Sequence, residues 1–305
     1  MIYDVIIIGG GPAGLTAAIY TARARRSTLM ICQGFPGGQI MQADVIENYP
    51  GFPEGISGME LGSAFYAQAE RFGLETVYST VTGITVSGRI RTVTTDSGEE
   101  YHSRTVILAT GASPRRLMVP GETELGGKGV SYCATCDGAL YKGKKVAVIG
   151  GGDTAAGESV FLTRFASEVH LFHRRDKLRA AGILQERLFA SSVTVHWNQK
   201  PLEILGDEQV TGVRFRDTVT GEDSIFECDG VFVLAGTAPN SDAFRATVAC
   251  DEAGYVIAGP SCETSVPGIF SAGDVNHDAF RQVATAVGDG ARAAHEADMY
   301  LENIE

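Results

Sequence analysis

The chain has 305 residues, of which 44% are hydrophobic and 20% charged, and its formal net charge is −12. This length and composition are typical of a globular protein with two domains of ordinary size, each with its own core. The negative charge argues against nucleic acid or an anionic membrane as a partner, because both would repel such a surface.

The chain opens with the pattern of a nucleotide-binding strand, loop and helix. Residues 5–8 are a continuous β-branched run, which predicts a parallel strand buried on both faces. The loop that follows matches GxGxxG with Gly9, Gly11 and Gly14, and residues 15–26 form an alanine-rich helical stretch. The first glycine makes a tight turn, the second lets the backbone approach a pyrophosphate, and the third lets helix pack on strand. We therefore predict a dinucleotide site at this helix N-terminus.

The next predicted strand, residues 27–32, departs from the usual pattern at its end. It lacks the Asp or Glu that usually holds the adenosine ribose. We expect the ribose to be held by other groups, with the backbone near Gln33 as a candidate. The basic residues Arg23, Arg25 and Arg26 are interpreted as a solvated turn that complements the helix dipole.

Strand and turn patterns alternate in the following segment. Residues 76–86 and 90–95 look like hairpin strands that turn near Gly88. A further strand over residues 101–109 runs into a glycine turn. The turn residues are Ala109, Thr110 and Gly111.

Cys133 and Cys136 form a CxxC motif that is followed at once by Asp137. Two cysteines at this spacing can close a small disulfide ring that an attacking thiolate readily opens. A CxxC can also be half of a zinc site, but the sequence has no second CxxC or His pair to complete the ligands. We therefore interpret the pair as redox-active and expect no metal.

The cysteine content also bears on the compartment. Six cysteines in a chain whose first residues show no signal-peptide pattern favour a cytoplasmic protein with a transient, catalytic disulfide. No apolar run is long enough to span a bilayer. We expect the protein in the cytoplasm, away from membranes.

A second strand, loop and helix pattern begins at residue 146. Its loop contains Gly150 and Gly152, with Ala155 at the third position. The residues expected to contact a second dinucleotide here are Gly150, Gly152, Asp153, Thr154 and Ala155.

Basic residues follow the next predicted strand, residues 168–172. They are His173, Arg174 and Arg175, with Arg179 shortly after. They stand where the fingerprint places the adenosine ribose, and guanidinium groups suit a 2′-phosphate whereas NAD would favour a carboxylate. We therefore predict NADP rather than NAD at the second loop.

The rest of the chain repeats the layout of its first part. Strands are predicted over residues 193–197, 210–216, 224–227 and 231–234. The closing segment, residues 268–275 with a helix over 282–301, belongs to neither copy and is expected to complete the first domain. The fold class is α/β, with two Rossmann-like domains of three layers. Each has a parallel sheet and an antiparallel β-meander, and the second domain is inserted into the first.

The order of these motifs resembles low-molecular-weight thioredoxin reductases, the flavoproteins of bacteria and plants. The resemblance runs from Tyr3 to Leu301. It is carried by the first glycine loop, residues 37–39, residues 47–52, residues 109–111, the Cys-Ala-Thr-Cys-Asp stretch, the second loop with its arginine cluster, residues 272–275, and Arg281 with Gln282.

The resemblance implies an FAD domain made of residues 1–114 and 244–305, and an NADPH domain of residues 115–243 that carries the CxxC. FAD would contact the glycine loop, the segments around residues 38 and 48, and the closing segment. The implied FAD residues are Gly9, Gly11, Pro12, Ala13, Gly14, Gly38, Gln39, Asn48, Ala109, Thr110, Gly111, Gly273, Asp274, Arg281, Gln282 and Val283.

The resemblance also implies a mechanism. Hydride passes from NADPH to FAD, electrons pass to the Cys133–Cys136 disulfide, and the dithiol reduces oxidised thioredoxin or a thioredoxin-like protein. By analogy Cys136 faces the flavin, Cys133 attacks the partner, and Asp137 donates and accepts protons. Asp137 could also be a helix N-cap. A homodimer is expected.

Two other functions remain open on the sequence. One is a relative that uses NADH or ferredoxin as donor, or another disulfide protein as acceptor. Gly157 motivates it, because the family commonly carries an acidic residue early in this helix. The other is a non-catalytic nucleotide-binding redox sensor, which the intact CxxC-Asp motif disfavours.

Overall fold

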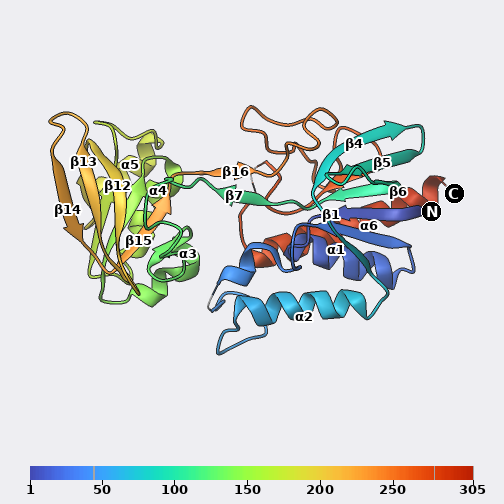
Figure 1. The fold of residues 1–305 in the computed structure, drawn as a ribbon, viewed down its shortest axis with the longest axis horizontal. Helices are drawn as coiled ribbons and strands as arrows, with labels where there is room; N and C mark the ends of the chain where they lie inside the picture. The colour runs from blue at the N-terminus through green and yellow to red at the C-terminus, as the bar shows by residue number, and fades with distance from the viewer. Residues whose placement is uncertain (44, 278, 305) are drawn as a thin grey trace. The chain divides into compact units, whose positions relative to one another are not determined.

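The computed structural model describes residues 1–43, 45–277 and 279–304, and the chain divides into two compact units. The first unit is Met1–Ser113 with Ala238–Glu305, and the second is Pro114–Thr237. The chain passes between them through two short paired strands, β7 (Ala112–Pro114) and β16 (Thr237–Pro239) (Figure 1). The second unit ends at Thr237, so the domain boundary expected after residue 243 lies a few residues beyond it, inside the first unit.

A mixed sheet forms the centre of the first unit. Its strands lie in the order β3-β2-β1-β6-β5-β4, with β17 also paired to β6. The parallel strands are β3 (Glu75–Tyr78), β2 (Thr28–Cys32), β1 (Ile2–Ile8), β6 (Glu100–Leu108) and β17 (Ile269–Ser271). The antiparallel strands are β4 (Val81–Ser87) and β5 (Ile90–Thr95).

Strand β1 is buried on both faces, as its β-branched run predicts. Val5 and Ile7 face the core formed with helices α1 (Pro12–Arg23) and α6 (Val283–Ile304). Ile6 and Ile8 face the opposite core, which includes residues of β4, β5 and the segment after β16. Helix α2 (Gly58–Glu70) and the short 3-10 helix η1 (Gly38–Gln42) complete this unit (Figure 1).

Two local predictions in the first unit are wrong. The strand expected over 76–86 is two strands, because the chain breaks at Ser79 and Thr80, where the Ser79 hydroxyl and the Thr80 N–H donate to Asp96. The arginines after α1 are not all solvated: Arg26 lies 2.6 Å from the Asp298 carboxylate on α6. That ion pair ties the end of α1 to the closing helix.

The second unit repeats the layout. A parallel sheet has the order β11-β10-β9-β15-β8, and a separate antiparallel sheet has the order β12-β13-β14. The parallel strands are β11 (Thr194–His196), β10 (Glu168–Phe172), β9 (Lys145–Gly150), β15 (Gly230–Leu234) and β8 (Val130–Ser131). The antiparallel strands are β12 (Gln199–Gly206), β13 (Val210–Asp217) and β14 (Asp223–Glu227), of which the sequence pattern missed β12.

Alternation along β9 builds the two cores of this unit. Val146 and Val148 pack with helices α4 (Asp153–Leu162) and α5 (Gly182–Phe189), whereas Ala147 and Ile149 pack against the antiparallel sheet. Two short helical turns, α3 (Ala134–Asp137) and η2 (Gly138–Tyr141), precede β9. Each unit therefore has helices, a parallel sheet and an antiparallel layer, and the predicted fold class is confirmed.

None of the helices in the described part of the chain is both long and apolar enough to cross a membrane.

Candidate active site

A disulfide joins Cys133 and Cys136, whose Cα atoms lie 5.3 Å apart. Cys133 is the N-cap of α3, and its Sγ accepts the backbone N–H of Cys136 at 3.1 Å. The remaining cysteines are free, and burial raises the pKa of every one of these thiols: to about 11 for Cys32 and Cys262, to about 12 for Cys228, and above its ordinary value for Cys250. Such thiols stay protonated and unreactive near neutral pH, which leaves Cys133 and Cys136 as the redox couple.

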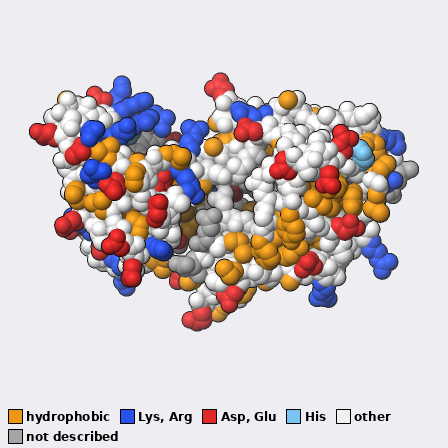
Figure 2. Space-filling model, in the orientation of Figure 1, with side chains coloured by type: hydrophobic (Ala, Val, Ile, Leu, Met, Phe, Trp, Pro, Cys, Tyr) orange, Lys and Arg blue, Asp and Glu red, His pale blue; other side chains and the backbone are white. Residues whose placement is uncertain are grey.

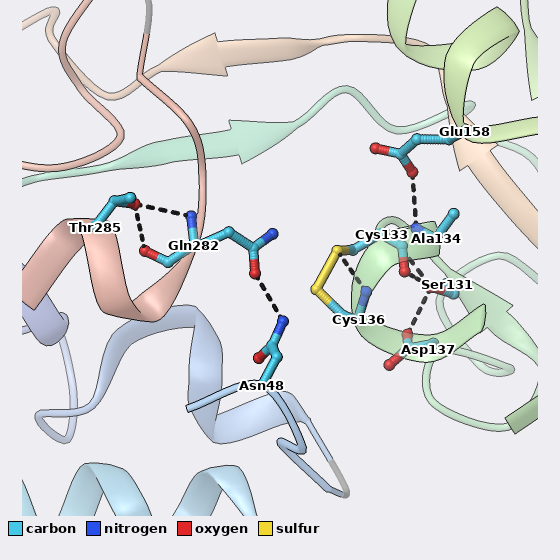
Figure 3. The surroundings of a disulfide bond; sticks show 9 residues. All are labelled: Asn48, Ser131, Cys133, Ala134, Cys136, Asp137, Glu158, Gln282 and Thr285. Atoms are coloured by element: carbon cyan, nitrogen blue, oxygen red, sulfur yellow. Dashed lines mark hydrogen bonds between the residues drawn. A yellow bond between two sulfur atoms is a disulfide. The ribbon is translucent and has the colours of Figure 1, made fainter. Parts of the chain in front are cut away.

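Two carboxylates and a hydroxyl contact the turn that carries the disulfide or one another (Figure 3). The Ser131 hydroxyl donates to Asp137 Oδ2 at 2.6 Å and accepts the Cys133 N–H at 3.2 Å. Asp137 stands at the N-cap of η2 but makes no capping hydrogen bond with its side chain. Its carboxylate is instead held by the Ser131 hydroxyl, which also accepts the Cys133 N–H.

Glu158 on α4 supplies the second carboxylate. Its Oε2 accepts the backbone N–H of Ala134 at 2.8 Å, and burial raises the pKa of this carboxyl. The sequence interpretation missed both Ser131 and Glu158. The available signal for Glu158 was that the acidic residue missing at position 157 is present at the next position.

The glycine loop of the second unit is closely packed at one end and open at the other. A Cβ on Gly150 would lie 2.5 Å from the Leu234 carbonyl oxygen and 2.6 Å from the Ala155 Cβ. A Cβ on Gly152 would meet nothing within 4 Å, and Gly152 caps α4 without a side-chain hydrogen bond. The open end leaves room for a phosphate at the start of the helix.

Backbone and side-chain hydrogen bonds tie this loop to the segment after β10. The Arg179 N–H donates to the Gly151 carbonyl at 2.8 Å. Asp153 Oδ1 accepts the N–H of Ala181, the N-cap of α5, at 2.7 Å. Asp153 and Thr154, the first residues of α4, are exposed. The residues predicted to bind the second dinucleotide therefore lie together at one edge of the sheet.

His173 differs from its arginine neighbours because it is buried, with 7% of its surface exposed. Its Nδ1 donates to the Gly150 carbonyl at 2.7 Å, and a Cβ on Gly151 would lie 2.2 Å from its ring. Burial lowers the pKa of His173, so the ring is neutral. Its Nε2 is buried with no partner in the described part of the chain. His173 therefore supports the glycine loop from its buried side, whereas a solvent-exposed side chain would contact it from outside.

The three arginines of this segment are exposed. Arg174, Arg175 and Arg179 form no ion pair with any described residue. Figure 2 shows Lys and Arg side chains gathered at the upper left, on the second unit. Guanidinium groups without a protein partner beside a glycine loop suit a phosphate monoester.

The loop of the first unit is packed more tightly. A Cβ on Gly9 would lie 2.2 Å from the Ala109 carbonyl oxygen, and one on Gly14 would lie 1.9 Å from the Gly9 carbonyl oxygen. At Gly11, the N-cap of α1, the nearest atom would be 4.0 Å away, and Pro12 follows as the first helical residue. The open position is again the second glycine, where a pyrophosphate would approach.

Two further segments meet this loop. Gly37 donates its N–H to the Gly10 carbonyl at 2.7 Å, which holds Gly38 and η1 against the loop. Ala13 is in contact with the closing segment, since a Cβ on Gly273 would lie 3.0 Å from the Ala13 Cβ. The α1 N-terminus is therefore enclosed by segments far apart in sequence.

Other predicted FAD residues lie in pairs within the first unit. Asn48 Nδ2 donates to Gln282 Oε1 at 2.9 Å, just before Val283 begins α6 (Figure 3). Gln39 Nε2 donates to the Ala112 carbonyl. These contacts join the η1 segment to β7 and to the closing helix.

Two polar groups of this unit bear on whether a cofactor fits there. The Thr110 Oγ1 atom is buried and has no hydrogen-bond partner among the described residues, whereas its carbonyl and that of Gly111 accept from Asn240. Asp274 is largely buried, and desolvation raises its pKa to about 6 against the lowering effect of Arg281. Buried polar groups usually have partners, so the Thr110 hydroxyl fits a ligand that carries polar groups.

The described residues hold no group of three or more His, Cys, Asp or Glu side chains placed to bind a metal ion.

Residues 3–290 match the family model described as pyridine nucleotide-disulphide oxidoreductase. The chain belongs to this family. It is 49% identical to a thioredoxin reductase of Bacillus subtilis, with 100% of this chain and 96% of that protein covered. It is 47% identical to a thioredoxin reductase of Listeria innocua, with 100% and 95% covered. The crystal structure of a thioredoxin reductase from Streptococcus pyogenes covers 99% of both chains at 43% identity, with a TM-score of 0.94.

These relationships confirm the resemblance drawn from the motifs. The protein is a flavoprotein oxidoreductase that uses FAD and NADPH, as predicted. Two features of this chain suit these cofactors. The second glycine of each loop leaves open space, and the Thr110 hydroxyl has no hydrogen-bond partner among the described residues.

Proposed function

We propose that the protein is an NADPH-dependent thioredoxin-disulfide reductase. The observation that carries the proposal is the Cys133–Cys136 disulfide with Asp137 beside it, in a chain with two dinucleotide loops. The similarity to thioredoxin reductases over the whole chain supports it.

The first unit is the FAD-binding domain in this proposal. Gly11 and the N-terminus of α1 receive the pyrophosphate, while Thr110 and Asp274 offer polar atoms to the rest of the cofactor. Bound FAD supplies a two-electron carrier between a nicotinamide and a disulfide. The chain's own part is to orient it with the segments around Gly38, Asn48 and Gln282.

The second unit is the NADPH-binding domain. Gly152 leaves space for the pyrophosphate, and the exposed Arg174, Arg175 and Arg179 bind the 2′-phosphate. His173 fixes the loop through Gly150. The choice of NADPH over NADH then rests on the arginines alone.

Thiol–disulfide exchange follows reduction of the disulfide to two thiols. The Cys133 thiolate attacks a disulfide of the partner and releases one partner thiolate, which gives a mixed disulfide. Cys136 then attacks Cys133 in that mixed disulfide, which restores the Cys133–Cys136 bond and releases the second partner thiol. Cys133 suits the first step because its sulfur accepts the Cys136 N–H, which favours the thiolate.

Asp137 moves the protons in this scheme. Ser131 holds its carboxylate beside the redox turn, where it accepts a proton from a thiol and returns it to a leaving thiolate. We further propose a homodimer in the cytoplasm, with thioredoxin or a thioredoxin-like protein as substrate.

A turnover assay tests the proposal. Purified protein reconstituted with FAD is mixed with oxidised thioredoxin and either NADPH, NADH or reduced ferredoxin. We expect rapid thioredoxin reduction with NADPH only. Turnover only with another donor would replace the proposed electron source, and flavin reduction by NADPH without thioredoxin reduction would point to a different acceptor. A protein that holds neither nucleotide would contradict the proposal.

A further inference from the structure

Glu158 is a half-buried acid that the proposed mechanism does not use. It lies on α4 and reaches the redox turn through the N–H of Ala134, a residue with no exposed surface between the two cysteines. Figure 3 shows its carboxylate directed at this amide. The hydrogen bond between Ser131 and Asp137 is a separate contact of the same turn.

Packing keeps Glu158 within reach of the turn. A Cβ on Gly138, directly after α3, would lie 3.2 Å from Leu162 Cδ2 and 3.5 Å from the Phe161 ring, both on α4. The short turn therefore sits against the helix that carries Glu158. The hydrogen bond is part of a fixed contact between two elements of the same unit.

The backbone N–H groups after Cys133 have separate partners. The Ala134 N–H donates to Glu158, the Cys136 N–H donates to the Cys133 sulfur, and the Asp137 N–H donates to the Cys133 carbonyl. After reduction, the charge on a Cys133 thiolate is stabilised by nearby N–H donors. The Glu158 carboxylate occupies the Ala134 N–H and places a negative charge on the amide that follows Cys133, and both effects disfavour the thiolate.

We propose that Glu158 is a positioning residue of the redox site, whose negative charge on the Ala134 amide holds Cys133 in its thiol form until a base removes the proton. This inference rests on the proposed function in one respect, the assignment of Cys133 as the attacking thiol. A Cys133 thiolate that formed too early could react with other oxidants. The negative charge of Glu158 therefore restricts thiolate formation to the step in which Asp137 removes the proton.

The pKa of Glu158 is consistent with such a role. Burial raises it, and the Ala134 N–H counteracts that rise. The Ala134 N–H therefore favours the ionised form of Glu158, on which the proposal depends.

The test is the pH profile of Cys133 alkylation. The FAD-loaded protein is reduced with dithiothreitol, the reductant is removed anaerobically, and the rate of iodoacetamide reaction at Cys133 is followed by mass spectrometry. Glu158→Gln keeps an oxygen that accepts the Ala134 N–H but removes the charge. We expect the profile to move down by about one pH unit, as for loss of a nearby like charge, so that alkylation below the thiol pKa is about tenfold faster.

Two further variants complete the test. Glu158→Ala removes the charge and frees the Ala134 N–H, so its profile should move down at least as far as that of Glu158→Gln. Glu186→Gln removes an exposed carboxylate on α5 of the same unit and should leave the profile unchanged. If Glu158→Ala does not fold, Glu158→Gln decides.

A Glu158→Gln profile that matches the wild type, or moves up, would overturn the inference and leave Glu158 as a packing residue. Because alkylation needs neither NADPH nor thioredoxin, its result is separable from the turnover assay. If the wild-type protein fails to reduce thioredoxin but Glu158→Gln still shifts the alkylation profile, the result counts against the proposed function and leaves this inference standing.

Discussion

The two glycine loops share a backbone plan and differ at the third position. In the first unit a methyl group on Gly14 would lie 1.9 Å from the Gly9 carbonyl oxygen, whereas the second unit has Ala155 at the same place. In both loops the second glycine, Gly11 or Gly152, has open space. The outer positions therefore serve packing of helix on strand, and the middle position serves the ligand.

The larger difference lies after the second strand of each unit. Strand β2 ends at Cys32 and is followed by Gln33, whose amide donates to Thr80. Strand β10 is followed by the exposed Arg174 and Arg175. The same scaffold thus presents neutral groups after one strand and cations after the other, and the proposed assignment of FAD and NADPH to the two loops rests on this difference.

The largest expected effect concerns the redox pair, which only the second unit has. Cys133→Ser or Cys136→Ser should abolish thioredoxin reduction, because neither variant can form the disulfide, while NADPH should still reduce a dye through the flavin. Steady-state assays with thioredoxin and with a dye measure both activities. Cys250→Ser, at a free and half-buried cysteine of the first unit, is the control that should keep both. Normal thioredoxin turnover by either active-site variant would rule out the dithiol mechanism.

Matched alanine substitutions test whether the outer glycine serves packing and the middle glycine serves the ligand. Gly14→Ala should destabilise the first unit by about 4 kcal/mol or more and release FAD, because a backbone atom blocks the methyl group. Gly152→Ala should unfold at the wild-type urea concentration but bind NADPH more weakly, because its methyl group occupies the phosphate space. Urea unfolding, FAD content and NADPH titration give the three quantities. Equal losses of stability in both variants would mean that the two glycines have the same role.

Removing the arginines tests the difference after the second strand. A charged hydrogen bond contributes roughly 1.5–3 kcal/mol, so each of Arg174→Ala and Arg175→Ala should raise the KM for NADPH by about one to two powers of ten. The KM for NADH and kcat should barely change. Arg187→Ala, at an exposed position on α5, is the control. Equal losses for NADPH and NADH would assign the arginines to structure rather than to phosphate binding.

The smallest expected effect is a pH dependence of the first unit without its cofactor. Burial raises the pKa of Asp274 to about 6 in the folded protein, against about 3.9 when unfolded. The folded state therefore takes up the proton first, and the free energy of unfolding should rise by roughly 2 kcal/mol as the pH falls from 7 to 4. Urea unfolding of the apoprotein across this range should show the rise, and Asp274→Asn should remove it. A wild-type slope equal to that of the variant would mean that Asp274 does not titrate there.

Much of the fold could be predicted from sequence because its central strands are buried on both faces. The apolar runs in β1 and β9, each followed by a glycine loop, marked both units. The pattern failed where strands are half-exposed: β12 contains Pro201 and mixed polarity, and the break between β3 and β4 depends on the distant Asp96. Such contacts carry no local sequence signal.

The site was predictable to the extent that it is built from motifs. The cysteines, Asp137 and the glycine loops were recognised because their spacing follows from their chemistry. The buried place of His173 beneath Gly151, and the contact of Glu158 with Ala134, arise from packing between elements. Sequence spacing alone contains neither of them.

The central claim is that electrons from NADPH pass through FAD in the first unit to the disulfide of the second. Anaerobic titration of the FAD-loaded protein with NADPH, followed by iodoacetamide labelling and mass spectrometry, tests it most directly. We expect the flavin to be reduced and both Cys133 and Cys136 to become labelled, whereas neither cysteine should be labelled in an untreated sample. Reduced flavin with the Cys133–Cys136 disulfide still intact would contradict it.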